Sequence, residues 1–388
     1  MNNGGRWMTG DACADRGGRY QSYISKLAKE VGRANRSGQM NDYCSGLLMP
    51  LERKSVEPIA AVTEPSRCAA KHQSLLHFVG QSPWSDAAVL RVVREQVLPV
   101  IERRGGAIRA WLIDDTSFPK KGNHSVGVKR QYCGQLGKKE NCQVAVTLSI
   151  ANEAASLPVA YRLFLPEDWA QDTARRTKAG VPETIPFQTK PEIALDHIRQ
   201  ALADGVPKGV VLADAAYGNN LKWRSELSDL GLSYCVGILP STTIWPPGKG
   251  PLPPVKSTTK SRGRPHKRLR RDDDNKPVSA KALATMLSAD QWQTLTWREG
   301  TNAPLTSRFA AVRVRPARRD NERTEPHPQE WLLIEWPEGE DEPTKYWLSN
   351  IAEAVSLKDI VDIAKGRWRI ERDYQVPGDN QSENSASI

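Results

Sequence analysis

Three acidic residues, Asp115, Asp214 and Glu371, stand in contexts that suit metal-dependent chemistry. The first follows the apolar run 110–113 and the second follows the apolar run 209–213, so each is expected where a strand ends. Open α/β sheets place their chemistry at the carboxyl ends of strands. Glu371 lies in a segment with helical spacing. Carboxylates on separate elements offer the hard oxygen ligands that Mg²⁺ or Mn²⁺ prefers, and two such ions can act on a phosphodiester.

The first acid has an acidic neighbour, Asp114, and the pattern does not separate the two. Adjacent residues on a strand point to opposite faces, so we expect one to be a metal ligand and the other a supporting or solvent-facing residue. Any single Asp at a strand end could instead be a helix cap or a turn residue. The joint placement of the acids on core elements favours the catalytic interpretation.

The overall charge points to a polyanionic partner. The net charge is +10 and the pI is near 9.3, which makes nucleic acid the leading candidate. No apolar run approaches the roughly 20 residues that span a bilayer, so no membrane partner is expected. The polar, Gly-rich start lacks a signal-peptide core, which favours a cytoplasmic protein. The scattered Cys and His residues show no zinc-type spacing.

Residues 256–276 form the most basic stretch, with nine Lys or Arg against three Asp, a local charge of 9 − 3 = +6. Lys267 and Arg268 lie in it, and a solvated loop that contacts phosphates is the favoured interpretation. Within the same stretch, Arg262 and Arg264 flank a glycine before a proline, a weak match to the minor-groove AT-hook core. Non-specific phosphate contact is favoured over AT readout.

Other basic and aromatic residues could also contact DNA. Lys120 and Lys121 follow the first acid and could grip the strand being cut, or simply keep a loop soluble. Arg367 precedes Glu371 by four residues, so the two share a helix face as a salt bridge or as a phosphate contact beside the acid. Tryptophans are concentrated in residues 240–350, where core packing is favoured over stacking on an unpaired base.

The periodicities predict an α/β protein with a mixed sheet covered by helices. Antiparallel strands, with a hairpin across 143–164, precede an alternation of helix and strand up to residue 239. The expected organisation is a disordered N-terminus 1–19, a helical and potentially DNA-binding domain 20–105, a catalytic core 106–239, a β-rich insertion 240–350, a final core helix 351–375 and an unstructured tail 376–388.

With these residues in view, the chain resembles the DDE transposases of bacterial insertion sequences, in particular the branch numbered seven hundred and one, a relative of the IS-four group. The resemblance covers about residues 40–375. Its motifs are Leu47–Ser55, His72–Leu75, Phe78–Val79, Ile113–Thr116, Phe118–Gly122, His124–Val128, Arg130–Lys138, Asn141–Val146, Asp214–Gly218 and Arg367–Glu371.

The resemblance implies an RNase H-like fold with a β insertion before the last catalytic helix. The family's three catalytic acids match Asp115, Asp214 and Glu371, and the arginine of its tyrosine–arginine–glutamate–lysine signature matches Arg367. It further implies two Mg²⁺ ions, replaceable by Mn²⁺, nicking at the element's ends, and joining of the freed 3′ hydroxyl to target DNA. A homodimer in a synaptic complex and a nucleoid-associated bacterial protein follow by the same analogy.

Two departures from the family stand out. Ala364 occupies the signature tyrosine position and Gly378 the lysine position. The match also ends near Gln375, where family members continue with a leucine-rich aromatic segment, so the sequence predicts a C-terminally truncated and impaired enzyme. The alternatives are a catalytically inactive DNA-binding relic, and another Mg²⁺-dependent DNA nuclease of the same fold that hydrolyses without joining.

Overall fold

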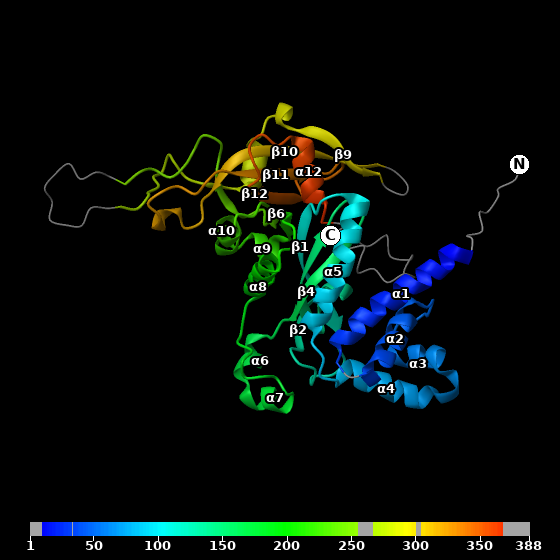
Figure 1. Ribbon diagram of the computed structural model, residues 1–388. Helices are drawn as coiled ribbons and strands as arrows, with labels where there is room; N and C mark the ends of the chain where they lie inside the picture. Colours follow the sequence, from blue (N-terminus) through cyan, green and yellow to red (C-terminus); the bar gives the residue numbers. More distant parts are fainter. Residues whose placement is uncertain (1–9, 33, 255–266, 300–303, 368–388) are drawn as a thin grey trace, which may run out of the picture. The chain divides into compact units, whose positions relative to one another are not determined.

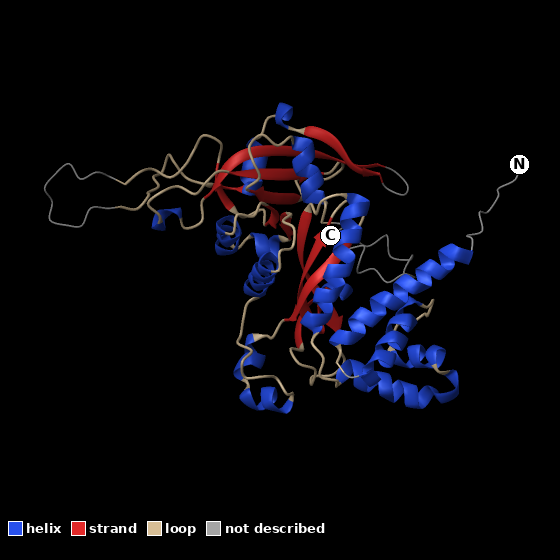
Figure 2. Ribbon diagram, viewed as in Figure 1, coloured by secondary structure: helices blue, strands red, loops and turns tan. Residues whose placement is uncertain are grey.

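The computed structural model describes residues 10–32, 34–254, 267–299 and 304–367. The chain divides into two compact units between Arg104 and Gly105, and each is considered by itself. Figures 1 and 2 show the helices of the first unit and the large sheet of the second.

The first unit is helical. Its larger apolar cluster includes Ile24, Leu27, Met40, Phe78 and Val92, and a smaller one is formed by Ile59, Ala60 and Leu75. The Trp84 ring stacks on Phe78, and its indole nitrogen donates a 2.9 Å hydrogen bond to the Phe78 carbonyl. The helices are α1 (Gly10–Glu30), α2 (Ala34–Leu48), α3 (Val56–Thr63), α4 (Cys68–Gly80) and α5 (Asp86–Gly105).

The observed helices exceed the predicted ones at two places. The sequence predicts disorder up to residue 19, but α1 begins at Gly10. A helix that is held by packed residues further along, such as Ile24 and Leu27, extends at low free-energy cost by single residues. Within the predicted helical region 20–105, α2 and α3 are not marked by the sequence pattern. Their apolar spacing is sparse, and Met40 and Ile59 become core residues only through packing against other helices.

The second unit is built on one mixed sheet. Its strands are β1 (Ala110–Pro119), β2 (Lys129–Cys133), β3 (Lys138–Ala151), β4 (Ser156–Leu163), β5 (Val210–Ala213), β6 (Tyr234–Ile238), β7 (Thr243–Trp245), β8 (Val278–Ser279), β9 (Gln293–Glu299), β10 (Pro304–Pro316), β11 (Glu330–Trp336) and β12 (Lys345–Ser349).

Five of these strands form the predicted RNase H-like sheet in the order β4-β3-β1-β5-β6. The β3 strand is antiparallel to both β1 and β4. The β5 strand is parallel to both β1 and β6. Parallel neighbours need crossover connections, and α8 and the α9–α10 pair supply them. The mixed α/β class expected from the sequence is confirmed.

The β-rich region 240–350 continues the same sheet. β12 pairs antiparallel with β6, and β11, β10, β7 and β8 follow in order, with β9 on β10. The inserted strands thereby cover an edge of β6 that would otherwise be open to other chains.

Helices cover the sheet in the second unit. α8 packs on β3 and β4, and α12 packs on β6, β9 and β10 (Figure 1). No helix in the described ranges is long and apolar enough to cross a bilayer. The helices are α6 (Glu167–Gln171), α7 (Thr173–Lys178), α8 (Lys190–Ala203), α9 (Ala215–Gly218), α10 (Leu221–Asp229), α11 (Ala280–Met286) and α12 (Leu357–Lys365).

Candidate active site

Asp114 and Asp214 lie side by side at the centre of the sheet. β1 and β5 are parallel, and Leu112 is paired with Leu212. Two positions further along both segments, Asp114 is therefore level with Asp214, the first residue after β5. Level residues on parallel strands point to the same face. Asp214 also caps α9, because its carboxylate accepts a 3.0 Å hydrogen bond from the Ala216 amide.

The face that carries these two acids is the face covered by α12. Leu112 and Leu212 are buried against Ile360, Val361 and Ala364 of that helix. These three residues recur at helical spacing, which gives α12 its apolar side. α12 ends at Lys365, so the chain leaves the helix beside the acids.

Arg367 contacts the first of these acids. Its Nη2 donates a 2.9 Å hydrogen bond to Asp114 Oδ1, which also accepts from the Asp115 amide at 2.9 Å. The Asp114 side chain is 21% exposed. Burial raises the pKa of the Asp114 carboxyl above its usual value, the Arg367 charge and the Asp115 amide lower it, and the negative charge of Asp214 raises it again. The two carboxylates are therefore close enough to repel each other.

Asp115 makes a different set of contacts. Its Oδ2 lies 2.7 Å from Lys190 Nζ at the start of α8, and its Oδ1 accepts a 2.5 Å hydrogen bond from the Tyr217 hydroxyl. α8 begins there because Thr189 and Glu192 form a capping box. Burial raises the pKa of the Tyr217 hydroxyl, and the charge of Asp115 raises it further. Asp115 is thus held by a cation and a neutral phenol.

A cavity of about 430 Å³ adjoins Asp214. It is partly lined by Trp297, Trp347, Lys365 and Arg367. The Lys365 ammonium contacts other side chains of the protein. It donates a 2.5 Å hydrogen bond to Glu335 and lies 4.3 Å from the Trp297 ring centroid. Aromatic rings and cations beside an acid suit a nucleotide unit of a DNA strand.

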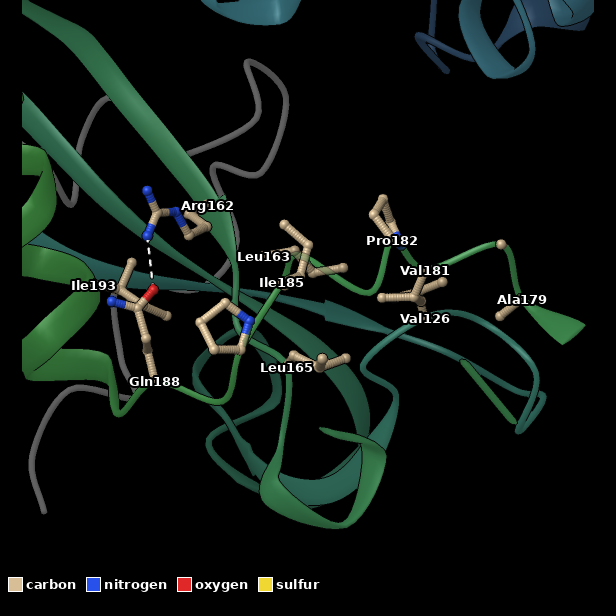
Figure 3. A pocket seen from close by; sticks show the side chains of 12 residues that line it. Val126, Arg162, Leu163, Leu165, Ala179, Val181, Pro182, Ile185, Gln188 and Ile193 are labelled. Carbon is tan, nitrogen blue, oxygen red and sulfur yellow. Dashed lines mark hydrogen bonds between the residues drawn. The ribbon is translucent and has the colours of Figure 1, made fainter. Parts of the chain in front are cut away.

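A second cavity, of about 340 Å³, is apolar (Figure 3). Val126, Leu163, Val181 and Ile185 contribute to its lining. One hydrogen bond, from Arg162 to the Gln188 side-chain oxygen, crosses its rim at 2.9 Å. The residues that line it include no carboxylate, so it lacks the ligands that the predicted chemistry requires.

The chemistry of the described donors fits a divalent cation. Asp114, in the middle of β1, and Asp214, directly after β5, are paired oxygen donors on adjacent strands, which suits Mg²⁺ or Mn²⁺. The sequence predicts a strand end at the first acid, but β1 continues to Pro119 because it pairs with β3 over its full length. Within the described ranges, no group of three or more His, Cys, Asp or Glu side chains is arranged to hold a metal. Glu371, the third predicted ligand, lies outside the described residues.

The predicted DNA-contacting residues are distributed more widely. Lys120 and Lys121 are exposed and follow the end of β1. Lys120 lies five positions after Asp115 along extended chain, roughly 16 Å at the rise of a strand, so neither lysine adjoins the acids. Lys267 and Arg268 are exposed in the basic segment, whereas Arg262 and Arg264 lie outside the described residues.

The basic segment also has a structural part that sequence reasoning missed. Leu269, its one large apolar residue, is buried, and its amide donates to the Arg323 carbonyl. Arg271 binds the buried Asp320 through two hydrogen bonds of 3.0 and 2.6 Å. Arg271 is therefore an anchor, while Lys267 and Arg268 remain exposed.

Lys190 and Tyr217 are the contacts of the site that sequence reasoning did not single out. Tyr217 follows Asp214 by three residues within the Asp-Ala-Ala-Tyr-Gly motif, and this proximity is a usable signal. Lys190 lies 75 residues from Asp115, at the start of α8 and directly after a polar loop of ordinary composition. Its role becomes visible only when α8 is placed on β3.

Comparison with known proteins gives three findings. The model of the family described as "DDE superfamily endonuclease" matches residues 26–304, a range that includes Asp114, Asp115 and Asp214 and ends before Arg367. A probable transposase for insertion sequence element IS701 from Microchaete diplosiphon is 35% identical over 195 residues, 50% of this chain and 46% of that protein. The chain thus matches less than half of that relative's length.

The third finding concerns solved structures. The NurA nuclease from Sulfolobus solfataricus aligns with 66% of this chain and 73% of its own at 10% identity and a TM-score of 0.27.

Proposed function

We propose that this chain, which belongs to the DDE superfamily endonuclease family, is a transposase that cuts the ends of an insertion element and joins the freed 3′ hydroxyl to target DNA. The observation that carries the proposal is the side-by-side placement of Asp114, in the middle of β1, and Asp214, directly after the adjacent parallel strand β5. The substrate is DNA, as element ends and as target.

The acids of the site are Asp214, one member of the Asp114–Asp115 pair, and Glu371. The resemblance selects Asp115 from the pair and assigns Glu371 as the third acid. These carboxylates would hold two divalent cations, Mg²⁺ or Mn²⁺ in its place, which would supply activation of the attacking oxygen and stabilisation of the leaving oxygen of a phosphodiester.

The remaining residues of the site would position the DNA. Arg367, 2.9 Å from Asp114, would contact the phosphate next to the scissile bond. Trp297 and Trp347 line the cavity beside Asp214, where they could pack against a nucleotide of the same strand. Lys120, Lys121, Arg262, Arg264, Lys267 and Arg268 would bind phosphates further along the duplex.

The same proposal includes the setting in which the protein works. Bringing two element ends together requires two active sites, so a homodimer in a synaptic complex is proposed by family analogy. A nucleoid-associated location in the bacterial cytoplasm is proposed on the same basis.

A plasmid assay tests the proposal. The substrate is a supercoiled plasmid that carries the element with its native flanks, incubated with the full chain and Mg²⁺ or Mn²⁺. We expect nicking at the element ends and joined products from the wild type, and neither from Asp214→Ala. Nicking without joined products would identify a hydrolytic nuclease of this fold. Salt-sensitive DNA binding without cutting would identify a DNA-binding relic.

A further inference from the structure

The two neighbouring acids in the middle of β1 belong to different faces of the sheet. Asp114 shares its face with Leu112, which packs under α12, and it is level with Asp214 on β5. Asp115 has the opposite orientation, because neighbouring residues on a strand alternate. β1 pairs with β3 without a register shift from Ala110 to Pro119, so no bulge changes this alternation.

We propose that Asp114, and not Asp115, is the β1 carboxylate that binds the divalent cation together with Asp214. This inference rests on the proposed function, since it assigns a ligand of the same site. A cation between strands needs both carboxylates on one face, and position 114 alone in the pair is level with position 214. The choice departs from the family resemblance, which selects the Asp that directly precedes Thr116.

The contacts of the two acids agree with this assignment. Asp114 meets Arg367, which follows α12 and precedes Glu371 by four residues in the sequence. Asp115 is bound by Lys190 and Tyr217, through one of its oxygens each. Both oxygens of Asp115 are thus engaged by protein donors.

Asp115 is a positioning residue in this arrangement. Tyr217, which it binds, belongs to α9, and the amides of Tyr217 and Gly218 donate to the Asp214 carbonyl at 3.2 and 2.8 Å. The hydrogen bond from Tyr217 to Asp115 therefore ties the first turn of α9 to β1. Because Asp214 caps that turn, Asp115 holds Asp214 in place without binding the cation itself.

Mn²⁺ binding to the full chain tests the assignment. The free-ion signal in electron paramagnetic resonance is measured during titration of the wild type and of Asp114→Asn, Asp214→Asn, Asp115→Asn and Lys190→Met. We expect Asp114→Asn and Asp214→Asn each to weaken Mn²⁺ binding by more than about 10-fold. We expect Asp115→Asn and Lys190→Met to weaken it by less than about 10-fold, which is the lower end of the loss commonly seen when a residue that contacts a metal ligand is mutated. Lys190→Met serves as a matched control because it removes the charged partner of Asp115 alone.

A thiol substitution keeps the test decisive if Asp114→Asn does not fold. Thiolate prefers softer metals than carboxylate does. In Asp114→Cys we expect Cd²⁺ to bind with a new sulfur-to-metal absorbance that Asp115→Cys lacks. The native cysteines contribute the same background to both variants.

The outcomes separate this inference from the proposed function. Loss of Mn²⁺ binding in Asp115→Asn with retention in Asp114→Asn would overturn the assignment, and so would equal losses or no Mn²⁺ binding by the wild type. Mn²⁺ binding that depends on Asp114 and Asp214, in a protein that does not nick the element plasmid, would support the assignment and reject the transposase proposal.

Discussion

The Tyr217 hydroxyl donates a 2.5 Å hydrogen bond to Asp115 Oδ1 and thereby ties β1 to the turn that Asp214 caps. The bond joins β1 to α9, the helix that follows the adjacent strand β5, across 102 residues of sequence. It therefore links the turn that Asp214 caps to the strand that carries Asp114 and Asp115.

Removal of this hydroxyl should lower the cutting rate more than it lowers stability. We expect Tyr217→Phe to lose about 1–2 kcal/mol of unfolding free energy, since Asp115 keeps Lys190 as a partner. Urea unfolding and the nicking rate at saturating DNA are the measurements. The control is Tyr20→Phe, which removes a hydroxyl that lies 3.0 Å from Ser45 Oγ in the helical unit. Equal rates for wild type and Tyr217→Phe would contradict the positioning role.

The buried Lys365 and Glu335 side chains should be strongly coupled in their contributions to the free energy of unfolding. Their side chains are 10% and 6% exposed, so Lys365→Met would leave a buried carboxylate without its cation at a cost of about 3–5 kcal/mol. Adding Glu335→Gln should recover part of that loss in thermal or urea unfolding. Lys358→Met, which breaks the exposed pair with Asp362, should change stability by less than about 1 kcal/mol. Additive losses in the Lys365 and Glu335 double variant would refute the coupling.

Acid should destabilise the second unit through His197. Burial, followed by the charge of Arg162, lowers the pKa of this imidazole to about 4 from an ordinary value of 6.5. Because the unfolded state then binds the proton more readily, His197 contributes its full stability above pH 6.5 and loses it as the pH falls towards 4. The loss amounts to about 3 kcal/mol over that window.

The variant that checks this pH dependence is His197→Gln. Glutamine does not titrate, and its amide can still donate to the Val146 carbonyl that His197 Nε2 contacts at 3.2 Å. Urea unfolding of both proteins from pH 7 to pH 4 should show a shallower slope for the variant. Parallel slopes would assign the acid sensitivity to other groups.

Neutralising the exposed part of the basic segment should reduce the salt dependence of DNA binding. If Lys267 and Arg268 each contact a phosphate, Lys267→Gln with Arg268→Gln should flatten the slope of log Kd against log salt by about 0.9 per lost contact. Lys276→Gln is the control from the same segment, because Lys276 is paired with Asp273. If the double variant has the same slope as Lys276→Gln, Lys267 and Arg268 do not contact DNA phosphates.

The sequence alone determines much of this protein's organisation. The apolar runs before Asp115 and Asp214 mark the strands that carry them, and both become β1 and β5 of the core. The apolar spacing of 357–364 marks the helix over the same face. These features are readable because each depends on residues within one or two turns or on the alternation within one strand.

The tertiary structure decides what lies beyond that range. Whether Asp114 or Asp115 faces Asp214 depends on the register of β1 against β5 and on the side that α12 covers. The Lys190 contact depends on α8 crossing the sheet, and the continuation of the sheet past β6 depends on β12 finding that edge. All three are contacts between segments that are far apart in the chain, and packing fixes their geometry. A local sequence pattern does not specify which distant segment will pack against it.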